Sequence, residues 1–557
     1  MGLLQILMTL AILMILVIPT GKYIYKVISG EKSFVDPVMN KIDNLLYRIT
    51  GIKKEEMTWK QYAIALVVAN AVMTLFVYIL FRIQSQLGLN PNGIKNMDPS
   101  LAFNTAISFI TNTNLQDYSG EWGLTNLSQM IAITFLMFTS AATGFAAAAA
   151  FIRGIAGKPL GNFFVDLIRL TTRILLPFSI IVTLLLVWQG VPQTLSPNRT
   201  ITTIEGSLQD IPLGPVASLE SIKHIGTNGG GFFGANSAHP FENPTPLTNL
   251  IELLSMMLLP ASIVYAFGLV LKNKKQGWVI FAAMAVLFVI SLTTCYFAES
   301  SGNPALAKVG LSQTMGNMEG KEVRFGVAQS SLFTTVTTAF TTGSVNNMHD
   351  SLTPLGGMVA MWQMMLNVVF GGKGAGFMNM IMYAILTVFL CGLMVGRTPE
   401  FLSKKIEGKE VLLIALAILI HPFIILVSSA IALSVPQGLA GISNPGFHGL
   451  SQVVYQFTSS AANNGSGFEG MADNTMFWNI STGIVMFIGR YISIIALLAV
   501  AGSLAVKKQV PVSVGTFRTD NSLFVFILVA VVIVIGALTF FPAIVLGPIA
   551  EHLTLGY

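Results

Sequence analysis

Four short polar segments of the sequence combine glycine with Asn, Thr and Ser, and none of them contains a carboxylate. They are Thr111-Asn112-Thr113-Asn114, Thr227-Asn228-Gly229-Gly230-Gly231, Thr341-Thr342-Gly343-Ser344 and Asn463-Asn464-Gly465-Ser466-Gly467. Glycine allows consecutive carbonyls to turn toward one axis, with hydroxyl and amide groups in support. Calcium and magnesium favour carboxylate ligands, whereas a neutral carbonyl cage replaces the hydration shell of potassium in channels. The segments therefore indicate a monovalent cation site, for potassium first and sodium second.

A short apolar run precedes each polar segment. The runs cover residues 102–110, 216–225, 330–340 and 450–460. Each has about ten residues, or roughly 15 Å as a helix, which is half a bilayer. Such a run suits a re-entrant pore helix better than a complete span, and its C-terminal end directs partial negative charge at the loop that follows. Non-helical backbone at that depth is tolerated where it lines a cavity, so the four loops are predicted to face a pore.

The four loops recur at nearly equal intervals. With Thr113, Gly229, Gly343 and Gly465 as centres, the spacings are 116, 114 and 122 residues. A single glycine-bearing loop would be an ordinary turn, but four at near-equal spacing indicate an internal repeat. Each repeat has the order span, pore helix, filter loop, span, so four parallel, channel-like units surround one pore. The expected division is 1–26 for the first transmembrane helix, 59–152, 165–272, 277–397 and 409–506 for repeats 1 to 4, and 522–557 for the last transmembrane helix and an outer tail.

Composition places these loops in a membrane protein. The 557 residues are 53% hydrophobic and only 10% charged, against about 25% charged in soluble domains. Unbroken apolar stretches also disfavour a transmembrane barrel, whose strands alternate apolar and polar residues. We therefore expect an all-α polytopic membrane protein with about ten transmembrane helices. The spans are placed at residues 3–23, 59–81, 127–152, 165–188, 247–271, 278–298, 379–396, 411–435, 477–506 and 523–546.

The distribution of Lys and Arg predicts the orientation. One set of alternate connections holds 22 of these residues, and the longer opposite connections hold seven. Positive residues stay cytoplasmic, so both termini and the filter loops are expected outside. The basic residues lie between spans rather than in one soluble patch, which argues against nucleic-acid binding and leaves membrane lipid as the surroundings.

Charged residues close to the loops are candidates for supporting roles. Asp117, Glu121, Glu242, Asp350 and Glu469 follow the loops and can form an outer acidic mouth that concentrates cations. The alternative is that they are ordinary solvated loop charges.

Two arginines are candidates for gating or coupling. Arg490 lies within a span, where an ionisable residue is costly, and can act as a barrier to the cytoplasm or as the partner of a carboxylate behind the filter. Arg397 lies near the inner surface, where an interfacial anchor is the alternative to a functional role.

Longer motifs add a family resemblance. They are Trp59-Lys60-Gln61-Tyr62, Thr111 to Gln116 with Tyr118-Ser119-Gly120-Glu121, Gly226 to Phe233 with His239 to Pro244, Met318 to Glu322 with Arg324-Phe325-Gly326, Gly396 to Glu400, and Ser459 to Gly465. Together they closely resemble the potassium-binding subunits of bacterial Kdp potassium-transporting ATPases over essentially the whole chain. The block from Gly226 to Pro244 is the most specific.

The resemblance implies a member of the superfamily of potassium transporters that works inside a pump of the bacterial cytoplasmic membrane. The ATP-hydrolysing partner in that pump, KdpB, is a P-type ATPase, and KdpC and KdpF are small membrane partners. Potassium enters the filter from outside and passes through an intramembrane tunnel toward KdpB. The family's filter falls on Thr111, Asn112, Thr113, Asn114, Gln116, Asn228, Gly229, Gly230, Gly231, Thr342, Gly343, Ser344, Asn464, Gly465 and Ser466.

The stretch 355–376 ends in the glycine-rich residues 371–376 and is expected to break a helix before the seventh span, since Gly costs about 1 kcal/mol per helical position relative to Ala. The resemblance also implies a mobile intramembrane loop below the filter at this place. Lys373 departs from the neutral pattern expected there. One hypothesis is that its charge repels potassium and acts as a gate or routes the ion sideways; the alternative is a lysine that snorkels to the interface.

Catalysis is not expected on this chain. Its five Gly-Lys pairs lack the following Ser or Thr of a P-loop, and the sequence has no Asp-Lys-Thr-Gly phosphorylation motif. The six histidines show no metal-ligand spacing, so potassium at the filter is the only metal expected.

We expect the chain to be the potassium-binding and translocating subunit of an ATP-driven importer. The alternatives are an autonomous potassium channel or gradient-driven potassium transporter, and a secondary transporter for an organic solute, which would favour two inverted repeats.

Overall fold

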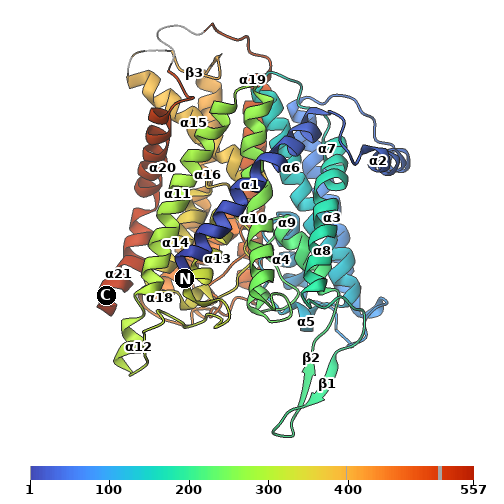
Figure 1. Ribbon diagram of the computed structural model, residues 1–557, viewed down its shortest axis with the longest axis vertical. Coiled ribbons are helices and arrows are strands. Elements are labelled where there is room, and N and C mark those ends of the chain that lie inside the picture. Colours follow the sequence, from blue (N-terminus) through green and yellow to red (C-terminus); the bar gives the residue numbers. More distant parts are fainter. Residues whose placement is uncertain (1, 395, 397, 512–516, 557) are drawn as a thin grey trace.

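The computed structural model describes residues 2–394, 396, 398–511 and 517–556. Within these residues, ten helical segments are long and apolar enough to cross a membrane, which confirms the predicted class (Figure 1). They are α1 (Gly2–Ser29), α3 (Trp59–Ile83), η2 (Ser128–Thr134) with α6 (Phe135–Ile155), α7 (Phe163–Leu170) with η3 (Thr171–Leu175) and α8 (Leu176–Trp188), α10 (Pro246–Val270), α11 (Lys274–Ser300), α15 (Ala375–Met394), α16 (Gly408–Ser434), α19 (Met476–Ala505) and α20 (Ser522–Ile544).

Shorter helices lie between the long ones. Four of them match the predicted half-membrane runs: α4 (Pro99–Ile110), α9 (Val216–Ile225), α13 (Gly326–Ala339) and α18 (Phe447–Ala462). The others are α2 (Asp36–Thr50), α5 (Gly120–Gly123), α12 (Pro304–Lys308), α14 (Pro354–Leu366), α17 (Pro436–Leu439) and α21 (Ala550–Leu555), with the short turns η1 (Gln84–Gln86), η4 (Asn236–Ala238), η5 (His349–Ser351) and η6 (Val545–Ile549). Each pore helix stands between two long helices. The residue boundaries of the repeats stay a prediction.

Two small antiparallel hairpins complete the fold. Strands β1 (Arg199–Thr202) and β2 (Leu208–Ile211) project from the end of the bundle where α1 begins and α21 ends (Figure 1). Strands β3 (Glu400–Phe401) and β4 (Lys404–Lys405) lie at the opposite end. The two chain ends therefore share one side of the bundle with the β1–β2 hairpin.

Helix starts follow from local capping chemistry. The Asp98 carboxylate accepts a hydrogen bond from the Ser100 amide at 2.8 Å, and Pro99 occupies the first turn of α4, where no N–H is needed. Thr353 and Pro354 start α14 in the same way. The stretch 355–376, which the sequence presents as one helix-breaking region, is thus a helix up to Leu366, and the break is confined to the residues that follow.

Small residues let the central helices approach closely. Gly268 of α10 and Gly277 of α11 face each other, so that a Cβ atom on Gly268 would lie 3.0 Å from the Cα atom of Gly277. Gly154 of α6 packs in the same way against Ala501 of α19. Such contacts replace the hydrophobic driving force that is missing between helices in lipid.

Replacing Gly268 by Val should destabilise the chain by about 1–3 kcal/mol, because the isopropyl group forces α10 and α11 apart. The matched control is Gly408→Val, since Gly408 at the start of α16 has no described neighbouring atom within 4 Å of an added Cβ. Thermal unfolding of the purified chain in detergent measures both. Equal melting temperatures for the two variants would contradict the proposed close packing.

Candidate functional site

The four pore helices end in the same kind of turn. A residue with positive φ follows each helix: Asn112 (65°), Thr227 (49°), Thr341 (48°) and Asn463 (57°). The next amide in each loop donates to the carbonyl five residues back: Thr113 to Ser108 at 2.9 Å, Asn228 to Lys223 at 2.7 Å, Thr342 to Thr337 at 2.8 Å, and Asn464 to Ser459 at 2.9 Å. This is the Schellman pattern of helix termination. The four loops therefore share one backbone design.

The shared turn corrects the predicted register of the loops by one residue. The structural equivalent of Gly229, Gly343 and Gly465 is Asn114, because it comes two residues after the positive-φ residue. Spacing alone pairs Thr113 with these glycines, which is wrong. The physical reason is that the first loop accommodates a positive φ of 59° at Asn114 without glycine, which Asn tolerates better than most residues.

The loops converge at their backbones. A Cβ atom on Gly229 would lie 2.7 Å from the carbonyl oxygen of Asn464, 2.9 Å from that of Thr113 and 3.0 Å from that of Thr342. Three carbonyl oxygens, from the first, third and fourth loops, thus surround one point beside Gly229 of the second loop. Side chains on Gly343, at φ 94°, and Gly465, at φ 104°, would collide with the carbonyls of Asn464 and Thr113, so only glycine fits there.

Asparagine side chains lock neighbouring loops together. Asn112 donates to the carbonyl of Thr227 at 2.7 Å, and Asn228 donates to the side-chain oxygen of Asn112 at 2.9 Å. Asn463 donates to the hydroxyl of Thr113 at 3.0 Å, which joins the fourth loop to the first. These buried amides bond to neighbouring loops, so their role is to hold the backbone in place.

Gln116 forms a clamp on the second loop. Its side-chain oxygen accepts from the amide of Gly231 at 2.8 Å, and its side-chain nitrogen donates to the carbonyl of Gly231 at 3.1 Å. Gly230 lies between Gln116 and Phe109, where an added Cβ would be within 3.0 Å of both side chains. Gln116, Gly230 and Gly231 therefore lie next to the ring and fix the shape of its second loop.

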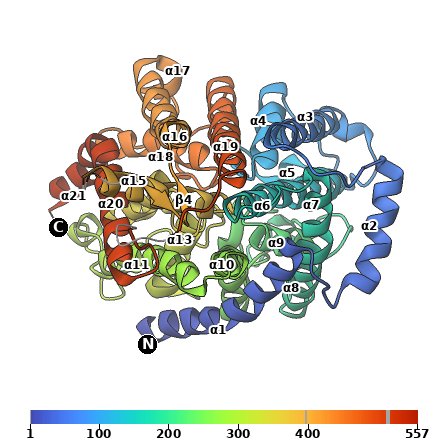
Figure 2. The ribbon, with the colours of Figure 1, turned by 90° about the horizontal axis from the view of Figure 1, so that it is seen from above.

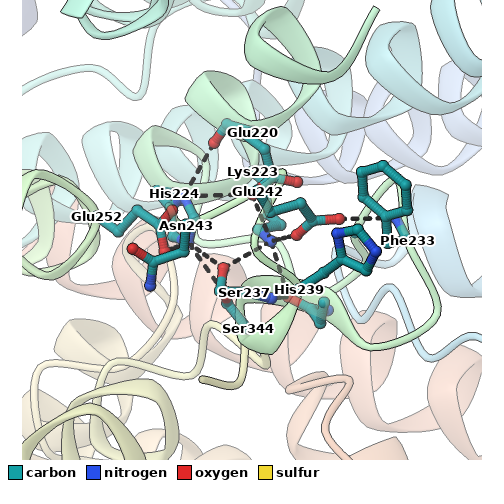
Figure 3. A network of polar contacts seen from close by, with 12 residues as sticks. Glu220, Lys223, His224, Phe233, Ser237, His239, Glu242, Asn243, Glu252 and Ser344 are labelled. Atoms are coloured by element: carbon teal, nitrogen blue, oxygen red, sulfur yellow. Dashed lines mark hydrogen bonds and ion pairs between the residues drawn. The ribbon is translucent and has the colours of Figure 1, made fainter. Parts of the chain in front are cut away.

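A buried ionic network stands behind the second and third loops (Figure 3). The ammonium of Lys223 lies 2.5 Å from Glu220 and 2.8 Å from Glu242, and all three side chains are fully buried. It also donates to Asn236 at 2.7 Å, and Asn236 in turn donates to the carbonyl of Gly229 at 2.7 Å. The Lys223 network thus reaches the ring and holds the Gly229 carbonyl.

The network also reaches the third loop. His224 and Ser237 each lie 3.0 Å from the hydroxyl of Ser344 (Figure 3). Glu220, His224 and Glu252 bring their ligand atoms within 4.8 Å of one another, but the Lys223 ammonium already supplies a positive charge among these carboxylates.

The predicted assignment of Glu242 to the outer mouth is wrong, because this carboxylate is fully buried against Lys223 and the amide of Phe233.

Two basic residues, Lys373 and Arg490, are buried near the loops. The amide of Lys373 donates to the hydroxyl of Thr227 at 3.1 Å, which places the glycine-rich turn directly against the second loop. The Lys373 side chain is 2% exposed, and its ammonium has no hydrogen-bond partner among the described residues, so the snorkelling alternative is wrong. An added Cβ on Gly144 would meet both the Arg490 guanidinium at 2.6 Å and the Lys373 carbonyl at 2.7 Å.

Arg490 is also buried, and it makes no ion pair with a described residue. Its guanidinium donates to the carbonyl of Ser140 at 3.4 Å. The expected ion pair between Arg490 and a carboxylate is therefore not found within the described part of the chain. Instead, the Arg490 guanidinium and the Lys373 backbone both lie beside Gly144. Arg397 lies outside the described residues.

A cavity of about 290 Å³ adjoins the loops, and Lys373 is not among the residues that line it. Asn114, Gly343 and Gly465 line it together with three acidic residues, Asp117, Glu469 and Asp473. Burial and the neighbouring Asp473 raise the pKa of Asp117 well above its usual range, and burial raises the pKa of Asp473 to about 6 and the pKa of Glu469 to about 8.

Only part of the predicted acidic mouth lines this cavity. Asp117 and Glu469 line it. Glu121 instead accepts a hydrogen bond from the amide of Gly234 at 2.9 Å, and Asp350 is hydrogen-bonded to His448 at 2.9 Å.

Sequence reasoning misses Asp473 because no motif surrounds it. Its position eight residues after Gly465 of the fourth loop, on the predicted outer side, is the signal that could have found it.

Comparisons with known proteins identify the family. The family model for the potassium-transporting ATPase A subunit, KdpA, matches residues 7–553. Proteins named potassium-transporting ATPase potassium-binding subunit are 65% identical in Clostridium acetobutylicum, over 100% of both chains, and 60% identical in Geobacillus kaustophilus, over 98% of both. In Caldanaerobacter subterraneus such a protein is 57% identical over 98% of both chains.

The fold is also similar to a solved structure. The potassium transporter TrkH from Vibrio parahaemolyticus superposes with a TM-score of 0.52 at 15% sequence identity, covering 77% of this chain and 84% of that one. At that identity the likeness concerns the fold, which is channel-like and built from repeats. With the family model matching almost the whole length, the chain belongs to the family of potassium-transporting ATPase A subunits.

Proposed function

We propose that this chain binds potassium in the ring of loop carbonyls and passes it into the membrane as the potassium-binding subunit of an ATP-driven importer. The observation that carries the proposal is the convergence of the Asn464, Thr113 and Thr342 carbonyl oxygens within 2.7–3.0 Å of one point beside Gly229. Relatives covering the whole chain carry the name of that subunit.

Selectivity for a monovalent cation follows from the chemistry of the ring. Its ligands are neutral carbonyl dipoles. The carboxylates of Asp117, Glu469 and Asp473 line the neighbouring cavity and are not part of the ring. The C-terminal ends of four pore helices add partial negative charge without a full charge. This environment replaces the weakly held water of potassium and offers too little charge to strip a divalent ion.

Two buried basic residues give the ion a direction after the ring. An ion that continued straight through would meet the backbone of Lys373 and the guanidinium of Arg490, which both lie beside Gly144. The charge of Arg490 and the glycine-rich turn at Lys373 act as a barrier to free passage into the cytoplasm, so the ion leaves sideways toward a partner subunit. This is the behaviour expected of a pump subunit rather than of an autonomous channel.

The assembly and its orientation belong to the same proposal. The ATP-hydrolysing KdpB and the small proteins KdpC and KdpF are the partners, and ATP is hydrolysed on KdpB rather than on this chain. The ring and both chain ends face the outside of a bacterial cytoplasmic membrane, since the connections at the other end hold most of the Lys and Arg residues.

Uptake in cells that lack other potassium importers tests the function. We expect growth and rubidium uptake at low external potassium only when the chain is expressed with KdpB, KdpC and KdpF. A partner ATPase whose phosphorylated Asp is replaced by Asn is the control, and it should abolish uptake. Equal uptake by the chain alone would instead mean an autonomous channel or gradient-driven transporter.

Gly343→Ala tests the ring itself. The added methyl group collides with the Asn464 carbonyl, so the Kd for potassium should rise at least about tenfold, equivalent to about 1.4 kcal/mol. Gly326→Ala is the matched control, because Gly326 also has a positive φ of 66° but has open space around it. Titration calorimetry of the purified complex measures both. Unchanged affinity in Gly343→Ala would remove this loop from the site.

The acidic cavity predicts a pH dependence. Lowering the external pH from about 8 to about 5 protonates Glu469 and Asp473, because burial raises their pKa values to about 8 and about 6, and this removes negative charge above the ring. Uptake at limiting potassium should then fall roughly two- to tenfold, since a charged cleft concentrates its ion.

The pair Glu469→Gln and Asp473→Asn should flatten that profile at its low-pH level, because it removes both carboxylates that titrate in this range. Glu205→Gln with Glu319→Gln removes two exposed carboxylates away from the cavity and serves as the control. A full pH response in the first double variant would show that the cavity carboxylates do not set it.

A further inference from the structure

Helix α2 (Asp36–Thr50) is attached to the bundle by its polar face. The fully buried guanidinium of Arg173 donates to Asp36 at 2.8 Å and to Asn40 at 2.6 Å, and it forms an ion pair with Asp43. These three partners, together with the buried Tyr47, recur every three or four residues along one side of the helix. The side chains that face the protein are therefore polar.

The opposite side of α2 is apolar and uncovered. Val38, Ile42, Leu45 and Ile49 recur at the same spacing, and they are 61%, 38%, 58% and 71% exposed. We call these four residues the α2 stripe. A helix on a soluble protein turns its apolar side inward, so α2 has the reverse arrangement. An uncovered stripe of this length requires an apolar environment around it.

The two flanks of the α2 stripe differ in chemistry. At about 100° per residue, Lys41 and Arg48 lie along one flank, and neither forms an ion pair with a described residue. Met39 and Leu46 lie along the other flank and are partly buried. The helix therefore has a basic edge, an apolar outer face and an apolar edge, in that order around its axis.

The position of α2 matches this division. It lies near the end of the bundle where α1 ends and α3 begins (Figure 1), and that connection is rich in Lys and Arg. Seen from above, α2 lies lengthwise at one edge of the molecule, so its axis runs across the direction of the long helices (Figure 2). A helix at that level and in that direction lies along a membrane surface.

We propose that α2 is a binding site for anionic phospholipid of the inner leaflet. The α2 stripe and the edge formed by Met39 and Leu46 contact acyl chains, and Lys41 and Arg48 bind the phosphate groups. Amphipathic helices with a basic polar edge lie in this way at the boundary between headgroups and acyl chains. The Arg173 contacts fix the rotation of the helix, so that the stripe faces lipid.

Spin-label accessibility tests the placement. Cys295 and Cys391 are first replaced by Ala, and a label is then attached at Ile42→Cys or, as the control on the polar side, at Asn44→Cys. The full chain with its partners is reconstituted in vesicles of phosphatidylglycerol and phosphatidylcholine. The label at residue 42 should be more accessible to oxygen than to a water-soluble nickel complex, and the label at residue 44 should show the opposite order.

Two results of that measurement would overturn the proposal. If the nickel complex reaches residue 42 as readily as residue 44, the α2 stripe faces water. If neither reagent reaches residue 42, a protein covers the stripe instead of lipid.

The choice of headgroup is tested by removing the basic edge. Lys41→Gln with Arg48→Gln should weaken the binding of spin-labelled phosphatidylglycerol roughly 10- to 30-fold, because two basic side chains near an anionic surface are lost. Lys95→Gln with Arg199→Gln removes two exposed charges at the other end and should leave binding unchanged. Equal loss in both double variants, or no loss in either, would show that the α2 edge is not the binding site.

Discussion

The structure depends on one constraint: backbone groups inside a bilayer need partners, because no water is there to supply them. Four pore helices end halfway across, and each leaves carbonyls without intrahelical bonds. The shared turn bonds one of these carbonyls in each loop, as between Thr113 and Ser108. The carbonyls of the loops face one another across the axis, where an ion can satisfy them. The backbone geometry that the bilayer requires is therefore the same geometry that the proposed potassium site uses.

The four loops are alike in backbone but not in support. The second loop is held by side chains that lie outside the four loops, since Gln116 clamps Gly231 and Asn236 holds the Gly229 carbonyl. Behind Asn236 stands the ion pair of Lys223 with Glu242, which is fully buried. Removing one partner of such a pair would leave an uncompensated charge, so the network resists distortion of this loop.

Charge is arranged along the axis in a consistent order. Carboxylates, among them Asp117 and Asp473, line a cavity beside the loops, neutral carbonyls form the ring, and Lys373 and Arg490 are buried outside that cavity. In the proposed function, a cation is therefore attracted, bound without a full counter-charge, and then repelled from the straight path. This order explains how a channel-like fold can serve a pump that must not leak.

The sequence by itself determined the number of long helices, the four half-membrane runs and the residues of the four loops, because hydrophobic length and glycine content are local properties. It placed Thr113 one residue out of register and put Glu242 in the mouth, because both depend on contacts between distant segments. Only the tertiary structure brought Lys223 behind the ring, Asp473 above it and Lys373 beside Arg490. Burial and ion pairing of these groups are set by neighbours from other parts of the chain, such as Asp473 for Asp117, and no local pattern encodes such neighbours.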